Sequence, residues 1–141
     1  MQNLLYTSDV FRGSRYGEGH PLDMDRVWPS VELIKMMGWI DDKQIVKHSP
    51  AHIEELIKFH DVDYVLALKE AEEKQTLPQE MKIKYNIGIG NNPIFKEVFS
   101  RPATAAKASI TAIESIAAKK ANRILNISGG RHHERKFQAY G

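Results

Sequence analysis

The chain has 141 residues, of which 42% are hydrophobic and 27% charged, a composition typical of a single globular domain over residues 1–141. A net charge of +2 is too small to indicate a nucleic-acid-binding surface, and the absence of cysteine excludes disulfides, thiol nucleophiles and cysteine-based zinc sites. The sequence shows neither a membrane span nor a secretory signal, so we expect a cytoplasmic protein with no membrane partner.

The first part of the chain predicts short strands that alternate with helices. Hydrophobic periodicity and turn residues set the bounds of each element. The predicted elements are a strand at 3–7, a glycine-rich loop at 12–19, a helix at 31–37 that ends at Gly38, and a short strand at 45–46.

Two further helices are predicted before residue 75. The first begins at Ser49-Pro50, because serine accepts a hydrogen bond from a helix N-terminus and proline is tolerated in the first turn. The second covers 63–74 and has an apolar stripe on one side. Its acidic residues, Glu70, Glu72 and Glu73, are predicted to form a solvated face.

The second part of the chain predicts a long loop, a long helix and a strand. Prolines, glycines and asparagines at 76–93 favour an irregular loop, and loops of this length are often functional. A helix follows from Ser100, with Ala106, Ile110, Ile113 and Ala117 as its predicted apolar stripe. A strand at 123–127 directly after this helix indicates an α/β layer with a parallel sheet.

The strongest candidate site follows that last strand, where Gly129 and Gly130 precede His132 and His133. Ligands bind at the carboxyl ends of strands in open α/β sheets, and histidine can act as a base near neutral pH. Adjacent side chains diverge, so the histidine pair suits acid/base chemistry better than coordination of one metal ion. Judged from the residues alone, a polar surface turn is the competing interpretation.

Two upstream residues are weaker candidates. His20, next to Gly19, either faces a ligand or shapes its own loop by stacking and hydrogen bonding. Arg26 has a similar alternative, a surface charge paired with Asp23 or Asp25.

Taken together, four groups of residues occur in the order found in the histone deacetylase superfamily. They are His20-Pro21 with Arg26-Val27; Ser49-Pro50-Ala51 leading to Phe59-His60 and Tyr64; Tyr85 to Gly88 leading to Asn92-Pro93 and Phe99; and Ser128 to His133. The chain resembles the amino-terminal part of a bacterial acetoin-utilisation or histone-deacetylase-like protein. The resemblance implies a partial arginase/deacetylase-type α/β fold, a short parallel sheet of about three strands with flanking helices, in which the first strand lies between the second and third.

The resemblance also implies hydrolysis of the amide of an acetylated lysine or amine. His133 would be the general base and acid, and His132 its electrostatic partner. The zinc ligands of the family lie farther along the sequence, so we expect no metal ligands and no cofactor within these residues. Because the family's chemistry needs the metal, we predict that this chain alone is inactive.

Other roles implied by the resemblance concern binding. Arg26, Gly129 and Gly130 would line an internal cavity, Gly141 the acyl-lysine tunnel, and Asn91 the rim that holds the substrate backbone. Relatives often carry an acidic residue at the position of Asn91.

The last strand would form an open sheet edge in this chain, and an open edge is a template for pairing. We therefore expect a homo-oligomer or a complementary carboxy-terminal chain, with substrate bound only after complementation and with no nucleic-acid partner. The alternative function is a stand-alone interaction or oligomerisation module derived from the deacetylase fold.

Overall fold

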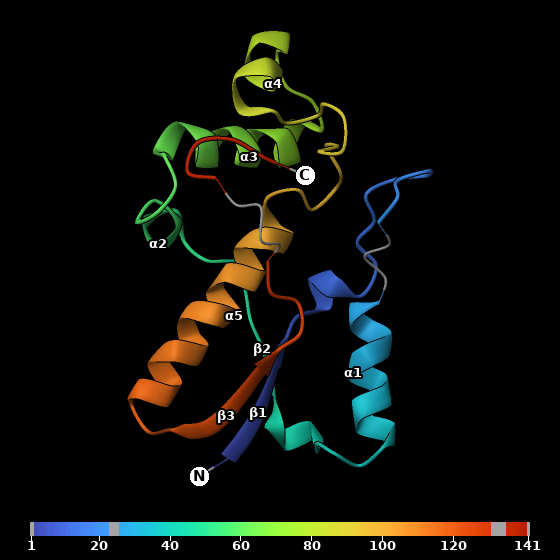
Figure 1. Ribbon diagram of the computed structural model, residues 1–141, viewed down its shortest axis with the longest axis vertical. Coiled ribbons are helices and arrows are strands. Elements are labelled where there is room, and N and C mark those ends of the chain that lie inside the picture. The colour runs from blue at the N-terminus through green and yellow to red at the C-terminus, as the bar shows by residue number, and fades with distance from the viewer. Residues whose placement is uncertain (1, 23–25, 131–134, 141) are drawn as a thin grey trace.

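The computed structural model describes residues 2–22, 26–130 and 135–140. A small sheet lies at one end of the molecule and three helices at the other, and the long helix α5 runs between the two ends (Figure 1). Among the described residues, no helix is both long and apolar enough to cross a membrane.

The sheet has three parallel strands. β1 (Gln2–Thr7) lies between β2 (Ile45–Lys47) and β3 (Ala121–Asn126), with Leu5 opposite Ile45 on one side and Leu125 on the other. The second half of β1 is buried, as is usual for a parallel strand with neighbours on both sides. This confirms the parallel sheet and the position of its first strand.

Helix α1 (Val27–Met36) stands beside the sheet and follows a one-turn 3-10 helix, η1 (Asp9–Phe11), and a loop (Figure 1). α1 begins four residues earlier than predicted because Pro29 lies in its first turn, where the missing N–H of proline leaves no hydrogen bond unmade. It ends as predicted before Gly38, whose φ of +67° favours glycine.

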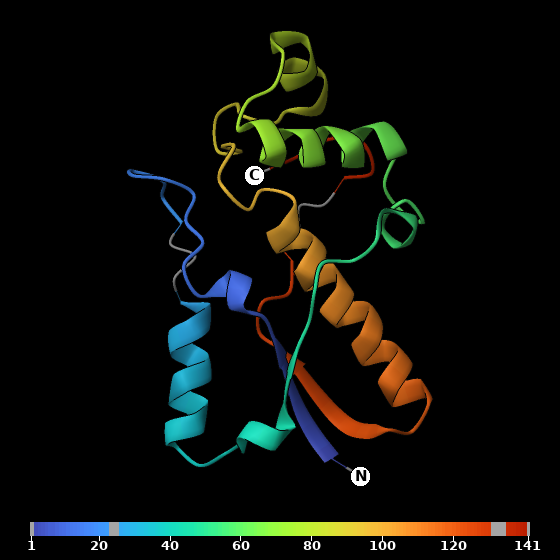
Figure 2. The ribbon, with the colours of Figure 1, turned by 180° about the vertical axis from the view of Figure 1, so that it is seen from behind.

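Helix α5 (Ser100–Ala117) packs against β1 and β3, as Figure 2 shows from behind. The helix was predicted, but its buried stripe was wrong. The buried side chains are Ala103, Thr104, Ala105 and Ala108, whereas Ile113 is 72% exposed. The first half of α5 approaches the rest of the molecule through small side chains, and its larger residues remain on the outside.

The other end of the molecule contains α2 (Ile53–Leu56), α3 (Val62–Lys74) and α4 (Gln79–Tyr85). Its buried core joins α3, α4 and the segment before α5, and comprises Tyr64, Ala67, Ala71, Leu77, Tyr85, Ile87 and Val98. Burial raises the pKa of the Tyr64 phenol to about 12, so this hydroxyl stays protonated at alkaline pH where an exposed tyrosine ionises.

Three predictions for this end were wrong. Ser49-Pro50 does not start a helix: the Ala51 N–H donates to the Ala103 carbonyl (3.1 Å), and α2 begins only at Ile53, after His52. The loop predicted at 76–93 contains α4, whose Tyr85 packs into the core against α3. The acidic face is not wholly solvated, because the Glu72 carboxylate accepts hydrogen bonds from the start of α5.

Candidate functional site

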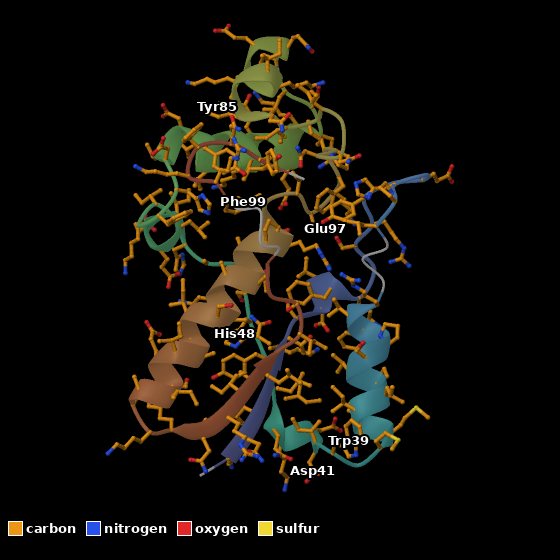
Figure 3. All side chains as sticks on the ribbon, in the orientation of Figure 1. Trp39, Asp41, His48, Tyr85, Glu97 and Phe99 are labelled. Atoms are coloured by element: carbon orange, nitrogen blue, oxygen red, sulfur yellow. The ribbon has the colours of Figure 1, made fainter. Side chains whose placement is uncertain are left out.

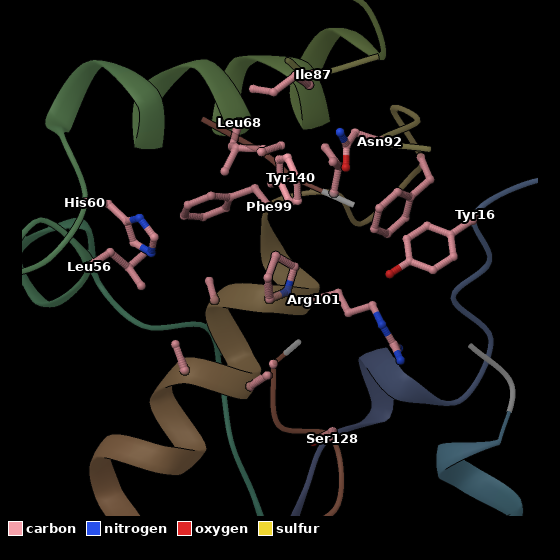
Figure 4. A pocket seen from close by; sticks show the side chains of 18 of the residues that line it. Tyr16, Leu56, His60, Leu68, Ile87, Asn92, Phe99, Arg101, Ser128 and Tyr140 are labelled. Atoms are coloured by element: carbon pink, nitrogen blue, oxygen red, sulfur yellow. The ribbon is translucent and has the colours of Figure 1, made fainter. Parts of the chain in front are cut away.

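A pocket of about 450 Å³ lies where α3, the start of α5 and the segment after β3 meet (Figure 4). Most of its wall is apolar or aromatic. The aromatic side chains that line it are Tyr16, Tyr64, Phe95, Phe99 and Tyr140. Such a wall suits a ligand that buries an apolar chain.

Four of the residues predicted from the sequence line this pocket: Arg26, Asn91, Gly129 and Gly130. They come from three separate segments: the start of α1, the loop before α5 and the turn after β3. Their common location is a result of the tertiary fold, and the roles assigned to them remain predictions. The other three predicted site residues, His132, His133 and Gly141, lie outside the described residues.

His20 shapes its loop. Its Nδ1 accepts a hydrogen bond from the Leu22 N–H (3.1 Å), which leaves Nε2 to carry the proton and donate to the Asn91 carbonyl (3.2 Å). The imidazole also stacks on the Tyr16 ring, with 4.4 Å between ring centroids. His20 therefore joins the loop before α1 to the rim of the pocket, in agreement with the loop-shaping interpretation.

A tight turn holds Asn91 at the rim. The Gly88 N–H donates to the Asn92 carbonyl (2.6 Å), and the Asn92 N–H donates back to Ile89 (3.0 Å). Gly88 has a φ of +74°, and a Cβ added there would lie 3.2 Å from Ile94 Cδ1. The turn therefore needs glycine for both its backbone conformation and its space.

The far side of the pocket is closed by the chain after residue 134. The Asp61 N–H donates to the Lys136 carbonyl (3.0 Å), His60 Nδ1 lies 3.1 Å from the Arg135 carbonyl, and the Ala139 N–H donates to Tyr85 (2.9 Å). These contacts hold Gln138, Ala139 and Tyr140 against the pocket. Residues 135–140 are thus attached to the start of α3 and to α4.

Sequence reasoning missed Arg101, which lines the pocket from the first turn of α5. Its guanidinium lies over the Phe11 ring, 4.9 Å from the centroid, and burial lowers its pKa. One signal was available: an arginine, followed by proline, interrupts a helix start that is otherwise rich in small residues.

The described residues do not fit a zinc site. Across 2–22, 26–130 and 135–140, no three His, Asp or Glu side chains are grouped so that they could hold a metal ion. A catalytic zinc site takes three protein ligands, which the described residues do not supply.

Comparison with known proteins identifies the relatives of this chain. Residues 20–141 match the family model of the histone deacetylase domain. The chain is 31% identical to histone deacetylase 1 of Oryza sativa subsp. japonica over 131 residues, and 29% identical to the acetoin utilization protein AcuC of Bacillus subtilis (strain 168) over 134 residues. These alignments cover 89% and 95% of this chain but only 24% and 34% of the relatives.

Solved structures of HDAC homologues also match the chain. The chain matches an HDAC homologue complexed with SAHA (TM-score 0.90, 34% identity) and an HDAC homologue from Aquifex aeolicus (TM-score 0.91, 35% identity). The matches cover 99% and 100% of this chain and 37% of each solved one, so the chain spans about a third of their length. The chain belongs to the histone deacetylase family and has the fold of the amino-terminal part of its arginase/deacetylase-type domain.

Proposed function

We propose that this chain forms the amino-terminal part of a zinc-dependent amide hydrolase that acts on acetylated lysine or an acetylated amine, and that it is inactive without the rest of the fold. One observation carries the proposal: the chain matches an HDAC homologue over 99% of its own length, at a TM-score of 0.90, yet covers only 37% of that protein. This supports a catalytic unit of which a large part lies outside these residues.

His132 and His133 are proposed to move protons during hydrolysis. His133 takes a proton from the attacking water and later gives one to the leaving amine, and His132 stabilises the charge that develops beside it. Their position in the sequence supports this role, because they follow Gly129 and Gly130, which line the pocket. Arg26 and the two glycines form part of the cavity wall, and Asn91 and Gly141 hold the substrate.

Zinc, when bound to the complete fold, lowers the pKa of water and polarises the amide carbonyl. We propose that its ligands come from the remainder of the fold, since the described residues contain no suitable group of three donors. The part played by this chain is then to bind the acyl group, to exclude water from the pocket and to handle protons.

The test is amide hydrolysis of an acetyl-lysine peptide. We expect no turnover from the purified chain with added Zn²⁺. Turnover should appear when a second polypeptide carrying the remainder of a homologous fold is added, and His133→Ala in this chain should abolish it. Zinc-dependent turnover by the chain alone, lost in His133→Ala, would contradict the proposed inactivity.

A second candidate function is an interaction module, and exposed apolar side chains on α5 and β3 favour it. Ile113 and Ile116 on α5 are 72% and 42% exposed, and Leu125 on β3 is 47% exposed. Among the described strands, β3 pairs with β1 alone and leaves its other edge open. We propose that this edge associates with a second copy of the chain or with a complementary chain.

A further inference from the structure

The pocket has an unusual balance of charge. Its described lining residues include three arginines, Arg26, Arg101 and Arg135, and neither aspartate nor glutamate. Arginines on a largely apolar wall attract an anion, and the attraction is strongest where the guanidinium is shielded from solvent. A ligand that carries an anionic group would therefore suit the described part of the pocket.

The three arginines differ in their surroundings. The Arg135 guanidinium lies over the Tyr140 ring, 4.1 Å from the centroid, and Arg135 is exposed, as is Arg26. Arg101 is only partly exposed, and it extends from the start of α5 toward Tyr16 (Figure 4). It is therefore the arginine whose charge is least screened by solvent.

The charge of Arg101 is incompletely matched. Its Nη1 is buried and has no hydrogen-bond partner among the residues that the structure describes. Tyr16 and then Glu97 favour the charged guanidinium electrostatically, but one oxygen of the Glu97 carboxylate already accepts a hydrogen bond from Ser14 (3.1 Å). The Phe11 ring supplies only a cation–π contact. A partly buried guanidinium with a buried, unpaired nitrogen is stabilised by a further anion.

Carboxylate is the anion that fits best. Arginine presents a planar fork of N–H donors that matches two carboxylate oxygens, and such bonds are stronger than those between neutral groups. The apolar and aromatic side chains that line the same pocket as Arg101, such as Phe95 and Phe99, suit a short methylene chain. A methylene chain that ends in a carboxylate would satisfy both parts of the pocket.

We propose that Arg101 binds the terminal carboxylate of the acyl group, so that the pocket selects amides of short dicarboxylic acids, such as succinyl amides, over acetyl amides. This inference rests on the proposed function in one respect, that the pocket takes the acyl part of the substrate. Arg101 is then a specificity-determining residue for that acyl group.

The test is binding to the full ¹⁵N-labelled chain, followed by NMR chemical-shift titration. The probes are N-methylsuccinamate, a neutral isostere in which an isopropyl group replaces the carboxylate (N,4-dimethylpentanamide), and acetate. We expect N-methylsuccinamate to bind at least about tenfold more tightly than the isostere, because only the former makes a charge-assisted pair. It should also bind more tightly than acetate, which lacks the amide and the methylene chain.

Three variants test the residue itself. Arg101→Gln should weaken binding of N-methylsuccinamate about tenfold, and Arg101→Lys should lie between it and the parent because lysine keeps the charge without the fork. Arg123→Gln is the matched control, since Arg123 is exposed on β3 and does not line the pocket. Dispersed NMR spectra establish that each variant is folded. If Arg101→Gln is unfolded, the inference is tested by comparing the binding of N-methylsuccinamate and of its isostere to the unsubstituted chain.

Equal binding of N-methylsuccinamate and its isostere, equal binding of acetate, unchanged binding in Arg101→Gln, or no binding of N-methylsuccinamate would each overturn the inference. Different results would count against the proposed function and against the Arg101 inference. Acetyl-lysine turnover by the complemented enzyme without selective N-methylsuccinamate binding overturns only the Arg101 inference. Selective binding without any hydrolysis by the complemented enzyme supports the Arg101 site and counts against the proposed function.

Discussion

The Glu72 carboxylate on α3 caps α5, because its Oε2 accepts hydrogen bonds from the backbone N–H groups of Ser100 (2.7 Å) and Phe99 (2.9 Å). Phe99, at the cap position, makes no capping hydrogen bond with its own side chain. The cap therefore comes from another helix rather than from a neighbouring residue. Because Leu68 of α3 and Phe99 both line the pocket, this contact also fixes the distance between two of its walls.

Loss of this cap should destabilise the protein. Glu72→Ala removes the acceptor for both N–H groups, and we expect it to lower the free energy of unfolding by about 1–2 kcal/mol. Glu72→Gln keeps one neutral acceptor oxygen and should have a smaller effect. Urea denaturation measures both. The control is Glu73→Ala at an exposed neighbouring position, which should stay within about 0.5 kcal/mol of the parent; an equal loss there would contradict the cap.

The glycine turn at the rim should tolerate no side chain at Gly88. Gly88→Ala combines an unfavourable φ with close contact to Ile94, and we expect a loss of about 2 kcal/mol in thermal or urea unfolding. Gly90→Ala has the same kind of φ (+55°) but open space, so it should cost about 1 kcal/mol. Gly13→Ala, with open space and no left-handed φ, should cost nothing. Identical results for all three would refute this account.

The stability of the fold should depend on pH through His48. His48 is labelled in Figure 3, and its ring centroid lies 4.4 Å from that of Tyr6. Burial, followed by repulsion from Lys107, lowers the pKa of His48. The unfolded chain then binds more protons than the folded one between the folded pKa and about 6.5. The free energy of unfolding should therefore be fully retained above about pH 6.5 and fall as the pH decreases below it.

His48→Gln should flatten this dependence in urea unfolding measured across weakly acidic pH. A separate loss occurs at lower pH, because the hydrogen bond and ion pair from Lys107 lower the pKa of Glu55, and protonation of that carboxylate ends the pair. The two effects are separated by their pH ranges. A slope that is the same in the parent and in His48→Gln would rule out His48 as its source.

Self-association should involve the open edge of the sheet. We expect light scattering to detect a dimer at high concentration, and Leu125→Lys on β3 should weaken it, because a charge on an edge strand opposes pairing. Leu33→Lys on α1 is the control at another exposed apolar position, 57% exposed, and should leave the dimer intact. A monomer at every concentration tested would argue against this association, and a dimer sensitive only to Leu33→Lys would place it on α1.

Local patterns predicted some elements well and others poorly. The long helix from Ser100 and the strand after it were predicted because periodicity and turn residues act over a few neighbouring positions. The helix expected at Ser49-Pro50 was wrong because Ala51 is held by Ala103, a residue distant in the sequence. α4 was missed because its Tyr85 is stabilised by packing on α3, which no local pattern contains.

Local sequence patterns were enough to predict the elements whose stabilising interactions are local: an apolar strand before a glycine-rich loop, a helix that ends at Gly38, and a helix followed directly by a parallel strand. They also placed Gly129 and Gly130 at the end of that strand, where a site was expected. The folded structure alone brought these glycines into one pocket with Arg26 and Asn91, and it left the buried Nη1 of Arg101 without a hydrogen-bond partner among the described residues. The reason is physical: the environment of a side chain is set by residues from several distant segments, whereas sequence periodicity reports only the neighbours along the chain.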